Sequence, residues 1–79
     1  MLVPEMKNII LNKLKEGDVK AHITKIGYDD DVRYTTSMGI YVDGVLDETF
    51  HLTDVTNPEI DKFMKELNDL IMKNTLYLI

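Results

Sequence analysis

Residues 32–42 alternate between apolar and polar side chains, and this period of two constrains the fold more than any other feature of the chain. The even positions of this segment (VRYTTSMGIYV) are mainly apolar, and the odd positions are polar, small or aromatic. Such a pattern is typical of a strand with one face on a core and one face in solvent. The letters "YVDGVL" follow at once and indicate a hairpin to a second antiparallel strand.

Two registers of this hairpin compete. A two-residue Asp43-Gly44 loop pairs Ile40 with Asp47 and so sets an apolar side chain opposite a charged one. A three-residue loop that begins at position 42, with Gly44 left-handed, instead pairs Ile40 with Leu46. We favour the second register because it keeps the apolar side chains on one face.

Helical patterns flank the strands. Apolar side chains repeat at helical spacing from Pro4 to about Glu16, and Gly17 is a natural stop. A second helix is predicted from the N-cap Asn57 to near Asn74.

Residues 18–28 are predicted to form the first strand, in which the apolar positions change parity after Ile23. Either a bulge intervenes there or both faces of the strand are partly covered. The predicted fold is therefore α+β in the order α-β-β-β-α, a three-stranded antiparallel meander with two helices packed on one face.

The length of 79 residues indicates one small domain, residues 1–79. The sequence has no cysteine, which excludes disulfides, thiolate metal sites and cysteine nucleophiles. The start of the chain lacks the pattern of a secretory signal, and no apolar run is long enough to span a membrane. We therefore expect a cytoplasmic protein without membrane contact.

Negative charge gathers in the middle of the chain. The net charge is −5, and residues 18–57 carry eight acidic side chains against Lys20, Lys25 and Arg33. Such a surface repels phosphate backbones and favours a basic protein partner. Direct nucleic-acid binding is not expected.

The order of elements resembles, in architecture only, the double-stranded-RNA-binding domains. That family needs a basic start to its last helix, where it meets phosphates. Here the stretch is "NPEIDKFMKE", with Glu59 and Asp61 in place of positive charge. The resemblance therefore extends to topology and not to RNA binding.

The three consecutive aspartates, Asp29, Asp30 and Asp31, are a turn sequence. A weak divalent-cation site together with Asp54 is the alternative, but consecutive aspartates point in different directions and cannot all reach one ion. We favour a solvated turn that adds to an acidic end of the sheet.

Other polar candidates lie on the predicted strands. Tyr41 and His51 fall on the outer face of the sheet, which is either an ordinary solvated face or a docking surface. Glu48 is placed inward, where it is a general base with a raised pKa, a side chain at the sheet edge that reaches solvent, or the sign of a wrong register.

The C-terminal "TLYLI" is strongly apolar and follows a helix that has already used its apolar face. Leu76, Tyr77, Leu78 and Ile79 can extend the helix, add an edge strand or pack in an oligomer.

We expect a small acidic, non-enzymatic binding or regulatory protein without cofactor or metal. Small, acidic, cysteine-free chains are similar to many inhibitors encoded by phages and mobile elements, the anti-CRISPR proteins among them. That resemblance implies inhibition of a nucleic-acid-handling host enzyme. The alternative is a structural subunit that forms a homodimer through its apolar tail. The predicted partner-binding residues are Asp29, Asp30, Asp31, Tyr41, Asp47, Glu48, His51, Asp54, Leu76, Tyr77, Leu78 and Ile79.

Overall fold

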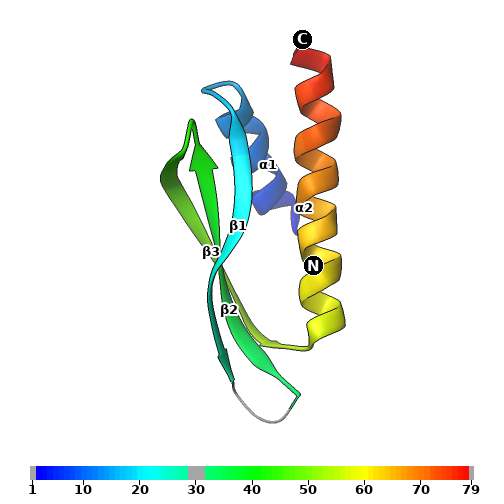
Figure 1. Cartoon of the computed structure of the whole chain (residues 1–79). Helices are drawn as coiled ribbons and strands as arrows, with labels where there is room; N and C mark the ends of the chain where they lie inside the picture. The colour runs from blue at the N-terminus through cyan, green and yellow to red at the C-terminus, as the bar shows by residue number, and fades with distance from the viewer. Residues whose placement is uncertain (1, 29–31, 79) are drawn as a thin grey trace.

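The computed structural model describes residues 2–28 and 32–78. The elements are α1 (Pro4–Leu14), β1 (Val19–Tyr28), β2 (Tyr34–Val42), β3 (Val45–Val55) and α2 (Asn57–Leu78). The strands form an antiparallel meander with β2 in the middle, and the helices contact each other and β1 (Figure 1). The predicted α+β fold is confirmed.

The β2–β3 hairpin has a two-residue loop, so the predicted three-residue loop is wrong. Val42 pairs directly with Val45. The two loop residues, Asp43 and Gly44, have φ angles of 51° and 83°. Positive φ at both central positions defines the type I′ turn, whose twist matches that of the flanking strands.

A β-bulge at Asp47 changes the register immediately after the turn. Tyr41 pairs with Leu46, whereas Ile40 pairs with Glu48, so Asp47 is the extra residue on β3. The later pairs then set buried side chains opposite each other, Met38 with Phe50 and Thr36 with Leu52. The tight turn and the apolar face are both kept, which neither of the registers without a bulge achieves.

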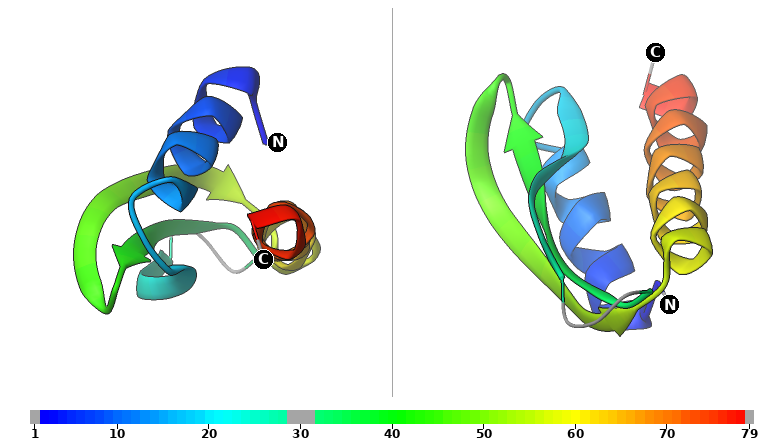
Figure 2. Two further views of the ribbon diagram at one scale, coloured as in Figure 1. Left: turned by 90° about the horizontal axis from the view of Figure 1, so that it is seen from above. Right: turned by 60° about the horizontal axis from the view of Figure 1, so that its bottom comes forward.

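Two further irregularities bend the sheet. In β1, Thr24 is an extra residue between Ile23 and Lys25, which decides the parity question in favour of a bulge. In β3 the register shifts again near Asp54, whose φ angle is 55°. Because bulges increase the local twist, the sheet is strongly curled, as Figure 2 shows.

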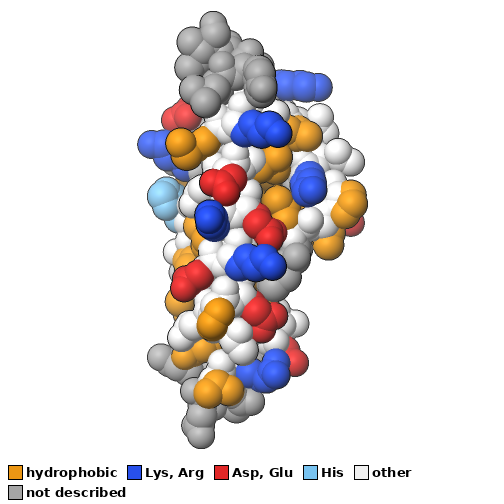
Figure 3. Space-filling model, turned by 90° about the vertical axis from the view of Figure 1, so that its right-hand side faces the viewer, with side chains coloured by type: hydrophobic (Ala, Val, Ile, Leu, Met, Phe, Trp, Pro, Cys, Tyr) orange, Lys and Arg blue, Asp and Glu red, His pale blue; other side chains and the backbone are white. Residues whose placement is uncertain are grey.

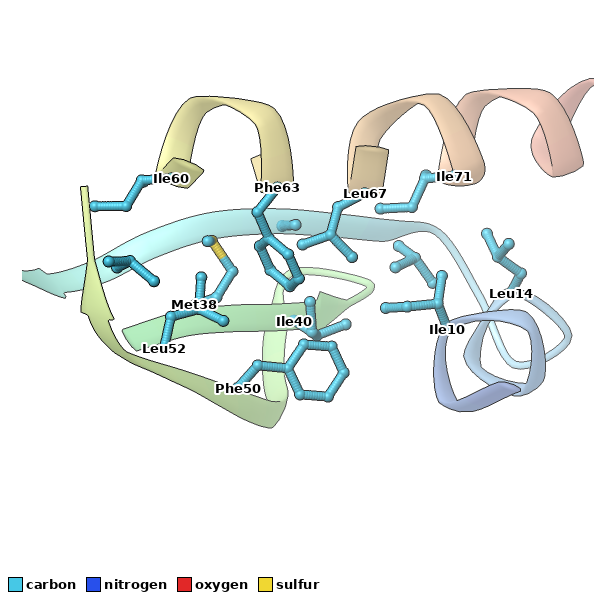
Figure 4. Packing of buried hydrophobic residues seen from close by; sticks show 13 residues of the cluster. Ile10, Leu14, Met38, Ile40, Phe50, Leu52, Ile60, Phe63, Leu67 and Ile71 are labelled. Atoms are coloured by element: carbon cyan, nitrogen blue, oxygen red, sulfur yellow. The ribbon is translucent and has the colours of Figure 1, made fainter. Parts of the chain in front are cut away.

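The hydrophobic core lies between the two helices and one face of the sheet (Figure 4). The predicted stripe of α2 supplies Ile60, Phe63, Leu67 and Ile71. Phe63 and Leu67 have no exposed surface. The other buried apolar side chains are Ile10 and Leu14 of α1, Val19 and Ala21 of β1, Met38 and Ile40 of β2, and Phe50, Leu52 and Val55 of β3.

Gly17 allows the turn after α1 to touch the tip of the hairpin. The Asp18 N–H donates to Oδ1 of Asp43 at 2.9 Å, and the Asp43 N–H donates to the Asp18 carbonyl at 2.8 Å. A Cβ on Gly17 would lie 2.7 Å from Cγ of Asp43. A side chain at this position would therefore have to displace the Asp43 carboxylate, so the constraint on Gly17 is close approach and not a left-handed backbone.

The start of α2 is capped one residue earlier than predicted. The helix begins at Asn57, which makes Thr56 the N-cap. The backbone N–H and the hydroxyl of Thr56 both donate to Oε1 of Glu59, at 3.1 and 2.9 Å. This is the half of the capping box in which the third helical residue reaches back to the cap.

The end of α2 lies beyond the predicted stop near Asn74, because the helix continues to Leu78. Asn74 and Thr75 donate side-chain hydrogen bonds to the carbonyls of Leu70 and Ile71, one turn earlier, at 2.8 and 2.7 Å. Neither α1 nor α2, as far as the structure describes them, combines the length and apolar character needed to cross a membrane.

Candidate functional site

The acidic residues nominated from the sequence do not gather on one face in the described part of the structure. Asp47, on the β3 bulge, forms an ion pair with Lys13 of α1. Its hydrogen bond raises the pKa of Lys13 above the ordinary value, while burial opposes that rise and the nearby charge of Glu48 supports it. Asp47 thus holds α1 against the sheet.

Glu48 lies on the core side of β3, as predicted, but opposite Ile40 and not Met38. Its side chain is half-buried. The Lys13 ammonium lies nearby, and the negative charge of Glu48 helps to raise the pKa of Lys13.

Asp54 lies at the opposite end of β3, in the bulge with positive φ. The Arg33 guanidinium donates to its carboxylate and its carbonyl, at 3.3 Å in both cases. This pair is exposed and joins the beginning of β2 to the end of β3. The predicted neighbours Asp29, Asp30 and Asp31 lie outside the described residues, so the proposed acidic end of the sheet is described only in part.

The outer face of the sheet carries basic and aromatic side chains. Tyr41 meets His22 edge-on, with ring centroids 5.6 Å apart. The exposed side chains of Lys20 and Lys25 lie on the same face, since they pair with outward-facing residues of β2. Leu46 is also here and not on the core side, because the bulge at Asp47 turns it outward. β1 therefore presents a row of basic groups in an acidic protein.

His51 and Ser37 face each other across β2 and β3. Ser37 Oγ lies 3.0 Å from Nδ1 of His51 on the exposed face. The sequence-based register set Ser37 opposite Thr49 and hid this pair. A serine next to a histidine is half of a nucleophilic constellation, but the structure gives His51 no carboxylate that would orient it, within residues 2–28 and 32–78. An ordinary cross-strand hydrogen bond explains the contact.

The C-terminal candidates fall on the last turn of α2. The backbone is helical through Leu78, so Leu76, Tyr77 and Leu78 extend the helix and do not form an edge strand, while packing in an oligomer stays a prediction. Ile79 lies outside the described residues. Among the side chains of α2 that the structure describes, which end at Thr75, the last one buried in the core is Ile71.

A groove with a volume of about 720 Å³ lies between β1 and α2. One wall is the start of β1, residues 18–22. The other wall is a stripe of α2 at helical spacing, composed of Met64, Asn68, Ile71, Met72 and Thr75. We call this hollow the edge groove, because β1 is an outer strand of the described sheet.

Sequence reasoning missed the edge groove because it assigned the apolar stripe of α2 to the core and stopped there. Met72 is 65 % exposed although its neighbour Ile71 is buried. The sequence does contain a second stripe on α2, composed of residues 64, 68, 72 and 75, one position further round the helix from the core stripe. Only tertiary packing places this second stripe over β1.

Basic and acidic side chains are mixed over the face of the molecule that Figure 3 shows. Asp61, Lys62, Lys65 and Asp69 of α2 are exposed. In the described part of the chain, no group of three histidine, cysteine or acidic side chains is arranged to hold a metal ion. Comparison with protein-family models, curated proteins and solved structures finds no match to this chain.

Proposed function

We propose that this protein is a non-enzymatic binding protein that acts through protein–protein contact, with the edge groove as its contact surface. One observation carries the proposal: α2 extends over the outer edge of β1 and leaves an apolar groove of about 720 Å³ beside an edge strand. Edge strands bind extended segments of other proteins through their backbone groups, and neighbouring pockets give specificity.

The lining of the groove suits an adaptable contact. Met64 and Met72 lie on its helical wall, and methionine side chains adjust to differently shaped apolar partners. Asn68 lies between them and can donate and accept hydrogen bonds. An apolar surface with one amide group in its middle is typical of a recognition surface.

The narrower hypothesis, an inhibitor of a nucleic-acid-handling enzyme with a basic partner, remains a prediction. That hypothesis places Asp47 and Asp54 on the acidic contact surface. Within the fold, however, Asp47 forms an ion pair with Lys13 and Asp54 forms one with Arg33. We therefore rest the proposal on the edge groove and leave the acidic residues aside.

A photo-crosslinking experiment tests the proposal. Benzoylphenylalanine is placed at Met72 in the groove and, as a matched control, at Val45 on the hairpin, since these side chains are 65 % and 67 % exposed. After irradiation in a lysate, we expect a defined partner to be crosslinked from Met72 and not from Val45. The captured protein is identified by mass spectrometry and purified for measurement of its Kd.

The purified pair gives the decisive comparison. Met72→Asp should weaken binding at least about tenfold, because it places a charge in the apolar groove, and Val45→Asp should leave the Kd unchanged. Equal effects of the two substitutions, or no partner from Met72, would contradict the proposal.

The alternative is a subunit that associates with itself through the end of α2. The observation in its favour is that the helix continues through Leu78, and its last turn has an apolar sequence. Light scattering distinguishes the two functions. A stable dimer that becomes monomeric when residues 76–79 are removed supports self-association, and a monomer at high concentration excludes it.

A further inference from the structure

The backbone of β1 determines which groups a partner meets in the edge groove. The Asp43 N–H donates to the Asp18 carbonyl, so Asp18 points its backbone toward the hairpin. Backbone direction alternates along an antiparallel strand. The N–H and C=O groups of Val19 and Ala21 therefore point away from β2, while their side chains are buried in the core. They are the backbone groups with which an added strand would pair at the edge of the sheet. Because Val19 and Ala21 are only 3 % and 5 % exposed as whole residues, the helix side chains in the groove have to move aside for that pairing.

The position of α2 gives an added strand a second surface. Met64, Asn68 and Met72 of the helix face the same groove as the edge of β1. A strand lies about 4.8 Å from its neighbour, which places an added strand directly beneath this stripe. Its inward side chains would then rest on the methionines, so they should be apolar.

The outward side chains of such a strand would meet positive charge. Lys20, His22 and Lys25 lie on the outer face of β1 and are exposed. Lys20 and His22 also line a hollow of about 280 Å³ on this face, together with Tyr41, Asp18 and Gly44. Opposite charges on neighbouring strands stabilise their pairing, so the outward side chains should be acidic, except beside Asp18.

A second copy of this chain fits the same edge poorly. Two β1 strands paired antiparallel about Ala21 would set Lys20 beside His22 of the partner at both ends of the pair, so neither end gains a pair of opposite charges. The bulge at Thr24 also interrupts the ladder and limits the added strand to the stretch 18–23.

We propose that the edge groove binds an extended segment of another protein, antiparallel to residues 18–23 of β1, in which apolar side chains facing α2 alternate with acidic side chains facing Lys20 and His22, with Lys25 just beyond the paired stretch. This inference rests on the proposed function and adds the chemistry of the partner. Although the protein has a net charge of −5, charges beyond about 8 Å are screened at physiological salt, and the basic row lies in direct contact with the segment.

The test uses the full chain and a fluorescent heptapeptide of alternating glutamate and valine, at physiological salt. Binding is measured by anisotropy, and the amide NMR signals of Val19 and Ala21 report the site. The control peptide has lysine in place of glutamate and should bind at least about tenfold more weakly, because several favourable cross-strand pairs become unfavourable. Equal affinity of the two peptides would overturn the inference.

Two N-methylated peptides test the ladder without altering the protein. In an antiparallel pair, the residues that bond to Val19 and Ala21 lie directly opposite and share their face, so they are the valines. N-methylation of the valines should abolish binding, because it removes the N–H groups that bond to β1. N-methylation of the glutamates should leave the Kd within about threefold, because their N–H groups point away from β1 and no hydrogen bond to it is lost. The reverse result contradicts the antiparallel arrangement.

Charge reversal on the protein completes the test. Lys20→Glu combined with Lys25→Glu should reverse the preference, so that the lysine peptide binds more tightly than the glutamate peptide. Lys7→Glu combined with Lys62→Glu changes the net charge equally at exposed sites away from the groove and should preserve the preference.

If no peptide binds while Met72 still crosslinks to a partner, the strand inference fails and the proposed function stands. If Met72 captures nothing, the proposed function itself fails.

Discussion

At the scale of single residues, close approach decides what Gly17 does. The glycine was expected to end α1, and a left-handed C-terminal glycine is the usual device. In the structure the C-cap is Lys15 in right-handed conformation, and positive φ among the described glycines is found at Gly44. Gly17 is needed because the carboxylate of Asp43 occupies the place of its side chain.

Gly17→Ala should therefore destabilise the protein by about 1–2 kcal/mol, the cost of displacing Asp43 from the Asp18 N–H. The control is the same substitution in an Asp43→Gly background, which removes the clash and suits the φ angle of 51° at that position. There Gly17→Ala should be neutral or stabilising, because it lowers the entropy of the unfolded chain. Urea unfolding of the four proteins gives both values, and an equal cost in the two backgrounds would disprove the mechanism.

At the scale of elements, the start of α2 depends on a charged cap. The hydrogen bonds from the Thr56 hydroxyl and backbone N–H hold the pKa of Glu59 below its ordinary value, with a smaller contribution from Arg33. A carboxyl whose pKa is lower in the folded state stabilises the fold above its unfolded pKa, and this stabilisation is lost as the pH falls through the folded value. The cap is therefore weakened by acid.

Glu59→Gln keeps an acceptor oxygen for Thr56 and removes the titration. We expect the wild type to be more stable than Glu59→Gln at pH 7, and the difference to shrink as the pH falls below 4.5, the ordinary pKa of a glutamate carboxyl, from which that of Glu59 is lowered. Asp61→Asn is the matched control, since it removes a carboxylate from the same helical turn without altering the contacts of Thr56. Urea midpoints at several pH values measure the effect, and a difference that does not depend on pH would contradict it.

The predicted elements agree with the structure where the signal is local. The period of two in residues 32–42, where the strand itself begins at Tyr34, and the stripe of α2 were readable, because each reports how a single element meets a core. The hairpin register could not be read from the sequence. Without a bulge, the tight Asp-Gly turn requires one register, and the matching of apolar faces requires another. The bulge at Asp47 satisfies both, and a bulge leaves no signal in the alternation of the partner strand.

At the scale of the whole molecule, α2 has two adjacent stripes with different tasks. Phe63 and Leu67 are fully buried and join the helices to the sheet (Figure 4). Met72, one position round the helix from the buried Ile71, is exposed over the edge groove. Stability and binding therefore depend on different side chains of one helix.

Phe63→Ala should cost about 3–5 kcal/mol, a large part of the stability of a domain this small. Phe63→Leu leaves a smaller cavity and should cost less, so it remains measurable if the alanine variant does not fold. Met72→Ala should change stability by less than about 0.5 kcal/mol, as exposed positions do. Thermal unfolding by circular dichroism provides the comparison, and a large loss in Met72→Ala would show that this residue belongs to the core.

The sequence by itself determined the order of the elements, their periods and the position of the hairpin at Asp43 and Gly44, because these follow from interactions between residues close together in the chain. Only the tertiary structure decided the three bulges, the pairing of Asp47 with Lys13 and of Asp54 with Arg33, and the overhang of α2 that opens the edge groove. These features arise between segments far apart in sequence, where packing selects among local conformations of similar energy. The candidate site belongs to this second group, because its two walls are separated by about half the chain.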